Sequence, residues 1–298
     1  MKDIINFIEN KLKIKVYQNY SASRLSTIKA GADVKYLILI KSIEEIKSLI
    51  KFLNIEKVKY KIIGNGSNII FPDSSINEIV IKFSREFDSY NVDKDLIKVS
   101  SSFSMMKFSR IISGLGFSGF EFAAGIPGLI GGGCIMNAGA HKSNISDVLE
   151  KIVICNEFGE LEELSANDLN YSYRNSNLGS ESIILFSEFK LVKADKNKIL
   201  KKLENNLYYR KNTQPLQMPS TGSTFMNPKS GFAGDYIERA GLKGYSIGGA
   251  QVSELHANWI INPEKKASSQ DLKNLIYFVK DRVYEKFQVN LETEVRFW

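Results

Sequence analysis

The stretch that decides the fold is residues 120–140, with the sequence FEFAAGIPGLIGGGCIMNAGA. Its glycines are Gly125, Gly128, Gly131, Gly132, Gly133 and Gly139. A packed core does not tolerate this much backbone freedom without a compensating interaction, because glycine loses more conformational entropy on folding than any other residue. We expect residues 131–136 to form a tight helical turn whose N-terminus faces a phosphate. A glycine-rich structural loop is the alternative.

A second glycine-rich loop has the sequence GNGSN at residues 64–68, between short predicted strands at 60–63 and 69–71. Its glycines allow positive φ, and successive bare amides form a concave site for an anion such as a pyrophosphate. The loop has neither the lysine of a Walker loop nor the third glycine of the dinucleotide fingerprint. A plain hairpin turn is the alternative. Two such loops at strand ends favour a dinucleotide held between two lobes.

The bulk composition is that of a soluble globular protein. The chain has 298 residues, enough for two or three domains, with 43% hydrophobic and 24% charged residues. No apolar run approaches the ~18–20 residues that span a bilayer, and the N-terminus does not resemble a signal peptide, so we expect no membrane insertion. Cys134 and Cys155 lie in apolar contexts and are interpreted as buried reduced thiols, which favours a cytoplasmic location.

The formal net charge of +7 comes largely from lysines scattered along predicted surface helices. A solvated basic face is one interpretation, and attraction of anionic ligands is the other. The sequence has no helix-turn-helix pattern, no zinc-ligand spacing and no arginine cluster with interleaved aromatics, so we expect no nucleic acid partner. It has two histidines and no acid cluster near them, so we expect no metal site.

Hydrophobic periodicity and capping signals place helices and strands along the chain. Helices are expected at 1–13, 42–53, 104–113, 195–211, 231–240 and 268–286. Strands are expected at 34–40, 79–83, 96–100, 183–192 and 256–263, with a hairpin of 148–155 and 160–164 that turns at Gly159. A glycine-rich turn is expected at 244–249. In a closing strand over 291–298, alternation places Glu292 and Glu294 on one face and Val295 and Phe297 on the other.

Two further stretches carry candidate chemistry. Residues 220–228, with the sequence STGSTFMNP, offer almost no apolar surface but can hold a hydroxyl group on a tight backbone. We therefore predict that Ser223 is a proton donor. Arg174 lies among aromatic and hydroxyl side chains in the stretch YSYRNS, residues 171–176. A fixed planar cation suits a carboxylate or a developing enolate, whereas an ordinary surface arginine is the alternative.

Six motifs, in the same order along the chain, resemble the family of UDP-N-acetylenolpyruvoylglucosamine reductase, a flavoenzyme of early peptidoglycan synthesis. They are GNGSN at 64–68, AGIPG at 124–128 continuing to NAGA at 137–140, YRNS at 173–176, GSTF at 222–225 with NP at 227–228, AGLKG at 240–244 and LETEVR at 291–296. Any one motif is a weak signal, but six in order over roughly residues 20–298 are specific.

The resemblance implies an α+β fold. A two-lobed FAD-binding domain of the vanillyl-alcohol-oxidase (PCMH) type would span residues 1–83 and 84–195, and a C-terminal α+β substrate domain would span 196–298. FAD would be bound non-covalently, NADPH would be the co-substrate, and the protein would be a cytoplasmic monomer. The short span between Arg174 and Ser223 resembles the compact class that lacks an inserted substrate-capping loop.

The resemblance also implies the reaction, the NADPH-dependent reduction of UDP-N-acetylglucosamine enolpyruvate to UDP-N-acetylmuramate. NADPH reduces FAD, and the reduced flavin N5 passes a hydride to C3 of the enolpyruvyl group. The carbanion at C2 then takes its proton from Ser223. Arg174 and Glu294 polarise the substrate carboxylate and stabilise the intermediate. These three are the expected catalytic residues.

The same resemblance assigns binding residues. The expected cofactor-binding residues are Gly64, Asn65, Gly66, Ser67, Asn68, Gly125, Ile126, Pro127, Gly128, Gly132, Gly133, Asn137, Ala138 and Gly139. The expected substrate-binding residues are Tyr173, Arg210, Asn227, His256 and Arg296.

The chain departs from the family pattern at Thr213 and Met226, where the family often has lysine, and at Asn65, where it usually has glycine. The lost lysines affect the expected phosphate and nicotinamide contacts, for which Arg210, Lys211 or Lys229 are substitutes. Two other functions stay open. One is a related FAD-dependent oxidase of a small alcohol or sugar, which can tether FAD through a residue such as His141 or Cys134. The other is an inactive nucleotide-binding relative.

Overall fold

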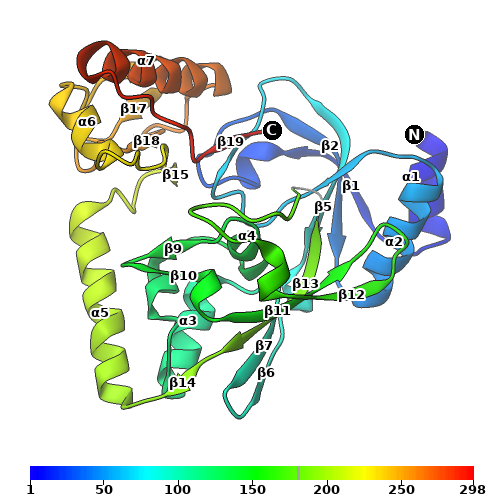
Figure 1. Ribbon diagram of the computed structural model, residues 1–298. Helices are drawn as coiled ribbons and strands as arrows, with labels where there is room; N and C mark the ends of the chain where they lie inside the picture. Colours follow the sequence, from blue (N-terminus) through cyan, green and yellow to red (C-terminus); the bar gives the residue numbers. More distant parts are fainter. Residues whose placement is uncertain (180–181) are drawn as a thin grey trace. The chain divides into compact units, whose positions relative to one another are not determined.

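The computed structural model describes residues 1–179 and 182–298 (Figure 1). The chain divides into two compact units. Unit 1 contains Met1–Asn19, Lys35–Gly64 and Asn77–Tyr208, and unit 2 contains Tyr20–Val34, Asn65–Ile76 and Tyr209–Trp298. The expected division into residues 1–83, 84–195 and 196–298 stays a prediction.

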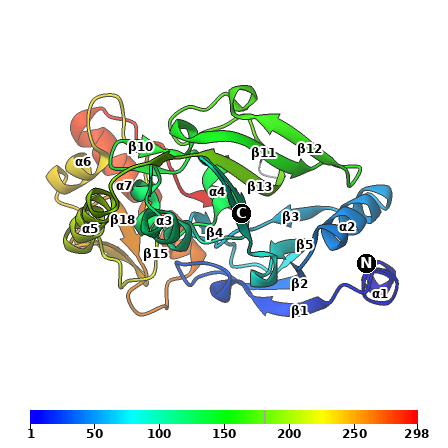
Figure 2. The same cartoon turned by 90° about the horizontal axis from the view of Figure 1, so that it is seen from below.

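The N-terminal lobe of unit 1 is built on a four-stranded sheet in the order β1-β2-β5-β3. Its elements are α1 (Lys2–Asn10), β1 (Val16–Ser21), β2 (Asp33–Ile40), α2 (Ile43–Ile55), β3 (Tyr60–Ile62) and β5 (Ile76–Phe83). Figure 2 shows α1 and α2 next to these strands. The apolar faces of both helices pack on one face of the sheet, where Ile8, Leu49 and Ile81 are fully buried.

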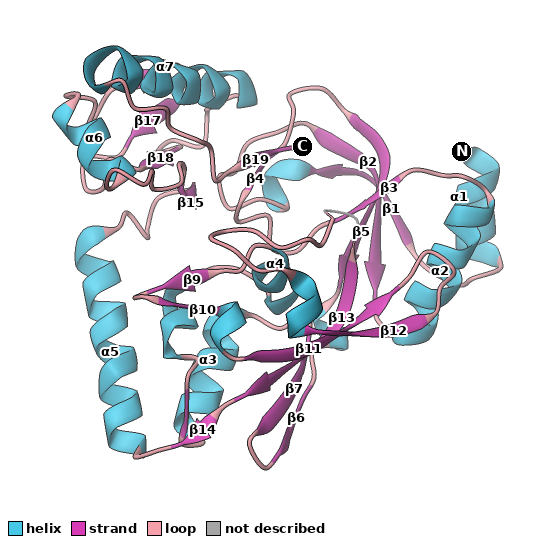
Figure 3. Ribbon diagram, viewed as in Figure 1, coloured by secondary structure: helices cyan, strands magenta, loops and turns pink. Residues whose placement is uncertain are grey.

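The middle lobe of unit 1 is built on an antiparallel sheet in the order β12-β11-β13-β7-β6 (Figure 3). Its strands are β6 (Tyr90–Asp93), β7 (Leu96–Ser100), β11 (Leu149–Cys155), β12 (Leu161–Ser165) and β13 (Ile183–Lys190), and its helices are α3 (Met105–Gly114) and α4 (Ile130–Ile135). Phe108, Phe120 and Phe189 form the aromatic centre of its core, with ring centroids 4.9 to 6.0 Å apart. Gly159, with φ of 75°, turns the β11–β12 hairpin as predicted.

Short elements complete unit 1. They are the strand pair β8 (Phe117–Ser118) and β14 (Val192–Lys193), the strand pair β9 (Gly139–Ala140) and β10 (Ser143–Asn144), and 3-10 helices at Arg85–Phe87, Glu121–Gly125, Ile145–Asp147 and Ala166–Leu169. The long helix α5 (Lys196–Thr213) begins in unit 1 and ends in unit 2. The buried Glu121 fixes its first part, because Lys202 Nζ lies 3.4 Å from the Glu121 carboxylate.

Unit 2 has an antiparallel sheet in the order β15-β18-β17-β16. Its elements are a 3-10 helix at Ala22–Arg24, β4 (Ile69–Ile70), β15 (Ser220–Ser223), α6 (Ala233–Arg239), β16 (Ser246–Ile247), β17 (Ala250–Val252), β18 (Trp259–Ile261), α7 (Ser269–Phe287) and β19 (Arg296–Phe297). Ser268 caps α7 in a capping box with Asp271. The apolar stripe of α7, which includes Leu275 and Val279, is fully buried in the core of this unit.

Three expectations about unit 2 need correction. The predicted strand at 256–263 is reduced to Trp259–Ile261, and the glycine-rich turn at 244–249 contains the strand β16. The closing strand over 291–298 is reduced to β19, because the backbone bends at Glu294 and Val295. The predicted alternation is therefore wrong: Val295 is 2% exposed and Phe297 is 39% exposed.

The cysteines match the expectation of buried thiols. Cys134 and Cys155 are free and buried. Among residues 1–179 and 182–298, no helix combines the length and the apolar character needed to cross a membrane.

The glycines of α4 have two different roles. The expected helical turn at 131–136 corresponds to α4, which packs against the sheet so closely that Gly131 N donates to Ser101 O at 2.9 Å. A Cβ on Gly131 would lie 2.8 Å from Ser101 Cβ, and a Cβ on Gly133 would lie 2.7 Å from Met105 Sδ. Gly132, between them, would have nothing within 4 Å. Internal packing thus requires two of these glycines but not the third.

We predict that Gly131→Ala destabilises the protein by about 1–3 kcal/mol, because the new methyl group overpacks the contact with Ser101. Gly132→Ala is the matched control in the same helix. It should leave stability unchanged or raise it by up to ~1 kcal/mol, since alanine has the better helix propensity. Urea unfolding of both variants checks this, and equal stabilities would contradict the packing argument.

Candidate functional site

The predicted site residues are distributed over both units. Unit 1 contains Gly64, Gly125, Ile126, Pro127, Gly128, Gly132, Gly133, Asn137, Ala138, Gly139, Tyr173 and Arg174. Unit 2 contains Asn65, Gly66, Ser67, Asn68, Arg210, Ser223, Asn227, His256, Glu294 and Arg296. The structure brings Ser223 and Glu294 together within unit 2, as described below. Arg174 belongs to unit 1, and its meeting with the other two stays a prediction.

In unit 1, Arg174 is held in an unusual backbone conformation beside the glycine-rich segment. Its φ is 57°, a left-handed value that is uncommon for a residue with a side chain. Its Nη2 donates to Gly139 O at 2.8 Å, and its guanidinium carbon lies 5.1 Å from the centre of the Tyr173 ring. The backbone strain and the two contacts fix the direction of the guanidinium group.

The loop around Arg174 is tied to the segment that follows α4. Asn137 donates through Nδ2 to Ser172 O at 3.0 Å, and its Oδ1 accepts from Ser146 N at 3.0 Å. Ser176 Oγ donates to Ile135 O at 2.8 Å. Asn137 was expected to bind the cofactor, but its buried side chain is used to join these two segments.

Within unit 1, Gly64, the first residue of the first glycine-rich loop, lies next to Leu129 of the second glycine-rich stretch. A Cβ on Gly64 would lie 3.8 Å from Leu129 Cδ1, so the first loop contacts the residue that precedes α4. A Cβ at position 64 would therefore be in ordinary van der Waals contact with Leu129. The convergence of a loop from each lobe is the arrangement expected for a dinucleotide held between two lobes.

Lys82, which the sequence analysis did not single out, lies beside the first residue of the first glycine-rich loop. It lies in β5, and its ammonium group donates to Gly64 O. Burial lowers its pKa to about 8. In the sequence, the feature that could have drawn attention to it is a lysine inside the apolar stretch IVIKF, residues 79–83.

In unit 2, Ser223 and Glu294 flank one backbone segment. Thr224, the residue after Ser223, accepts through its carbonyl oxygen from Glu294 N at 2.9 Å. One residue further, Phe225 pairs with Thr293 in an antiparallel bridge. Ser223 itself ends β15, after a register irregularity in its pairing with β18 and the positive φ of Gly222. A distortion of this kind changes the direction of the neighbouring side chains, which include Ser223.

Asn258 fixes the same segment from its other side. Its Oδ1 accepts from Phe225 N at 2.9 Å, and its Nδ2 donates to Phe225 O at 2.8 Å. Its backbone carbonyl accepts from Thr224 N at 2.8 Å. Asn258 is 4% exposed, so these bonds are shielded from water. The sequence analysis did not identify Asn258, because an asparagine next to an apolar strand carries no specific signal.

The first glycine-rich loop also contributes to this arrangement. Asn68, an expected cofactor ligand, donates through Nδ2 to Glu294 O at 3.0 Å, and Asn68 O accepts from Arg296 N at 3.0 Å. Its amide therefore positions the Glu294 backbone. The glycine at position 66 is also required by internal packing, because a Cβ there would collide with the Leu25 carbonyl.

Two expected substrate ligands already have intramolecular partners. Asn227 Oδ1 accepts from Ala233 N, the first backbone N–H of α6, at 3.0 Å. His256 Nδ1 accepts from Asn258 N at 3.3 Å, which fixes the neutral tautomer with its proton on Nε2. Burial is the main cause that lowers the His256 pKa, helped by the nearby positive charge of Lys243.

Arg210 has the features of an anion-binding residue. It is 7% exposed, and its Nε has no acceptor among the residues that the structure describes. Burial lowers its pKa to about 10, with no ion pair to offset the desolvation. Gln214, one turn later, has a buried Oε1 that likewise lacks a donor among the described residues.

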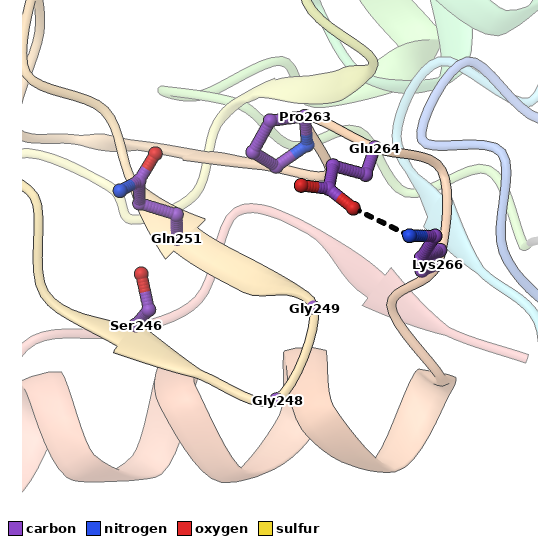
Figure 4. Close-up of a pocket in the computed structure, with 7 residues that line it drawn as sticks. All are labelled: Ser246, Gly248, Gly249, Gln251, Pro263, Glu264 and Lys266. Carbon is purple, nitrogen blue, oxygen red and sulfur yellow. Dashed lines mark hydrogen bonds and ion pairs between the residues drawn. The ribbon is translucent and has the colours of Figure 1, made fainter.

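Unit 2 also contains a pocket of about 410 Å³ between the β16–β17 hairpin and the turn that follows β18 (Figure 4). Its lining residues are Ser246, Gly248, Gly249, Gln251, Pro263, Glu264 and Lys266. Glu264 and Lys266 form an ion pair of 2.7 Å at its edge. None of the predicted site residues lines it.

Comparisons with known proteins identify the family. Residues 214–298 match the family model for the UDP-N-acetylenolpyruvoylglucosamine reductase C-terminal domain, and residues 34–165 match the model for an FAD binding domain. UDP-N-acetylenolpyruvoylglucosamine reductase 1 of Bacillus cereus is 39% identical over 297 residues, 99% of this chain and 98% of that protein. The chain belongs to the UDP-N-acetylenolpyruvoylglucosamine reductase family.

Other relatives agree. The reductase of Bacillus subtilis is 37% identical over 297 residues, again 99% of this chain and 98% of that protein. The crystal structure of the reductase from Thermus caldophilus superposes with a TM-score of 0.83 at 29% identity, over 96% of this chain and 99% of that chain. The expected fold, a two-lobed FAD-binding domain of the vanillyl-alcohol-oxidase type with a C-terminal α+β domain, is confirmed.

A more distant similarity concerns the fold alone. The glucose dehydrogenase Phl p 4.0202 superposes with a TM-score of 0.50 at 13% identity, over 65% of this chain and 44% of that chain.

We predict that Asn258→Asp destabilises unit 2 by about 2 kcal/mol or more. The substitution keeps the acceptor for Phe225 N but replaces the donor to Phe225 O by a buried carboxylate oxygen. Asn227→Asp is the matched control, because only the side-chain oxygen of Asn227 is used and aspartate keeps an oxygen acceptor there. Its stability should change by less than ~0.5 kcal/mol. Urea unfolding at pH 7 compares the two, and a neutral Asn258→Asp would contradict the role of Asn258.

Proposed function

We propose that this protein reduces UDP-N-acetylglucosamine enolpyruvate to UDP-N-acetylmuramate with NADPH and bound FAD, a step of peptidoglycan precursor synthesis. The observation that carries the proposal is near-full-length similarity to reductases of this family, together with the motif residues Ser223 and Glu294 on adjoining backbone. We propose that residues 1–83 and 84–195 bind FAD and that residues 196–298 bind the UDP-sugar.

The residues of unit 1 fit FAD. Gly132 has open space where a Cβ would point, so a flat ligand can approach its backbone closely. Non-covalent binding is supported by Cys134, the thiol nearest to these loops in sequence. It is fully buried and contacts Ser187 Oγ at 3.2 Å, and burial raises its pKa to about 12. A protonated and inaccessible thiol is a poor tether.

When bound, FAD supplies hydride transfer between NADPH and the substrate. Ser223 then acts as the proton donor to C2 of the reduced enolpyruvyl group. A serine hydroxyl is a weak acid in water, but the carbanion at C2 is a far stronger base, so positioning rather than acidity limits the step. The irregularity before Ser223 supports such positioning, as do the hydrogen bonds that Asn258 makes with Thr224 and Phe225.

Arg174, together with Glu294 in its protonated form, stabilises the charge that develops on the substrate carboxylate. Arg174 is suited to this by its fixed guanidinium plane, which can donate two parallel hydrogen bonds to a carboxylate. Glu294 is held through its backbone by Thr224 and Asn68, so its side chain starts from a defined place.

Arg210 is the proposed ligand for an anionic part of the UDP-sugar. It replaces the charge that the family often has at position 213, where the Thr213 hydroxyl group is bonded to Tyr209 O at 2.9 Å. We propose Tyr173 and Arg296 as further substrate contacts. The structural bonds of Asn227 and His256 leave Asn227 Nδ2 and His256 Nε2 as their proposed contact atoms.

The proposed partners are NADPH and the UDP-sugar, and the proposed state is a monomer in the cytoplasm. Two free buried thiols are compatible with a reducing compartment.

We predict that Ser223→Ala leaves reduction of the bound flavin by NADPH intact but slows its reoxidation by UDP-N-acetylglucosamine enolpyruvate by about 10²–10⁴-fold, because the proton donor is lost. Stopped-flow absorbance of the flavin follows the two half-reactions separately. Ser230→Ala, a change at an exposed serine in the same unit, should leave both unchanged. Equal reoxidation rates in Ser223→Ala and the parent would remove Ser223 from this role.

A further inference from the structure

Lys82 lies on the sheet face that α1 and α2 do not cover. Side chains alternate along β5, and Ile79, Ile81 and Phe83 point into the core that contains both helices. Lys82 therefore points to the opposite face. There its ammonium group donates to Gly64 O, at the place where Gly64 contacts Leu129 of the second glycine-rich loop.

The positive charge of Lys82 has no carboxylate partner among the residues that the structure describes. The charged side chains on its own strand and on the strands to either side are Glu78 on β5, Lys61 on β3, and Asp33 and Lys35 on β2. None of them shifts the Lys82 pKa, which is lowered to about 8 by burial alone. Burying an ammonium group without a counter-charge is unfavourable, and an anion bound beside it would offset this cost.

The ammonium group also has unused bonding capacity. It carries three donors, and the described residues supply an acceptor for one of them, Gly64 O. The remaining donors are available to a ligand bound at the junction of the two loops. A diphosphate bridge, with negative charge on both phosphates, matches an ammonium group at the start of a glycine-rich loop.

We propose that Lys82 is a cofactor-binding residue whose ammonium group holds the diphosphate of FAD where the two glycine-rich loops meet. The inference rests on the proposed function, because it requires FAD to bind there. It adds to the loop a charged ligand that the glycine-rich motif itself does not contain.

The pH dependence follows from the sign of the pKa shift. Without FAD, Lys82 is protonated below about pH 8 and loses its proton above it. The diphosphate favours the charged form and raises the pKa of Lys82 again. FAD affinity should therefore be greatest below about pH 8 and fall by up to about tenfold per pH unit above it, with the uptake of about one proton per FAD near pH 9.

The test is FAD binding to the apoprotein, measured by quenching of flavin fluorescence from pH 7 to 9, and proton uptake, measured by calorimetry in two buffers of different ionisation enthalpy. Lys82→Met should weaken FAD binding by about 10- to 100-fold at pH 7, abolish the proton uptake and flatten the pH profile. Lys35→Met, an exposed lysine on the neighbouring strand β2, should behave as the parent.

Lys82→Arg keeps the test decisive if the methionine variant does not fold. Arginine stays charged over this pH range, so this variant should bind FAD at pH 7 but lose the pH dependence and the proton uptake. Parent-like affinity in Lys82→Met, or a parent-like pH profile in either variant, would overturn the inference. Failure of the parent apoprotein to bind FAD at any pH would instead overturn the proposed function.

Discussion

The short segment of residues 224–226 is hydrogen-bonded along both of its edges, and the candidate site of unit 2 depends on this. Asn258 supplies one edge, and residues 292–295 supply the other. A segment paired on both sides cannot shift in register without breaking both sets of bonds. Ser223 and Glu294 therefore keep a constant relation, although the chain between them folds into two helices and most of a sheet.

Local sequence patterns predicted much of the fold. The stripe of α7, its capping box, the turn at Gly159 and the short helix α4 all follow from interactions within a few residues. The closing strand could not be predicted, because its course is set by two distant partners. Thr224 and Phe225 bind residues 293–295, and β4 binds β19.

The candidate site was predicted through motifs, and the contacts show why motif reasoning was incomplete. Motifs do not separate glycines needed inside the protein, such as Gly131, from glycines with an open face, such as Gly132. They also omit supporting residues. Asn258 and Lys82 acquire their roles from partners far away in the sequence, Phe225 and Gly64.

Each unit contains a basic side chain whose charge is expensive to bury. Lys82 in unit 1 and Arg210 in unit 2 both have their pKa lowered by desolvation alone. The scattered surface lysines cannot replace such groups, because solvent and salt screen them. A buried cation holds an anion more strongly, and the ligand in turn relieves the cost of its burial. Anionic ligands should therefore stabilise the protein by more than their contact area suggests.

The pairing of β4 with β19 has a consequence for biosynthesis. β4 consists of residues 69 and 70, and its partner consists of residues 296 and 297. On the ribosome, the early strand emerges long before the residues that pair with it. The core of the middle lobe is formed by residues 97–191, and the core of the N-terminal lobe is completed by Cys155, Ile183 and Leu185, so both can form before residues 296 and 297 emerge. The nascent chain must therefore keep β4 unpaired until residues 296 and 297 have emerged, and the half of the site that contains Ser223 and Glu294 closes only then.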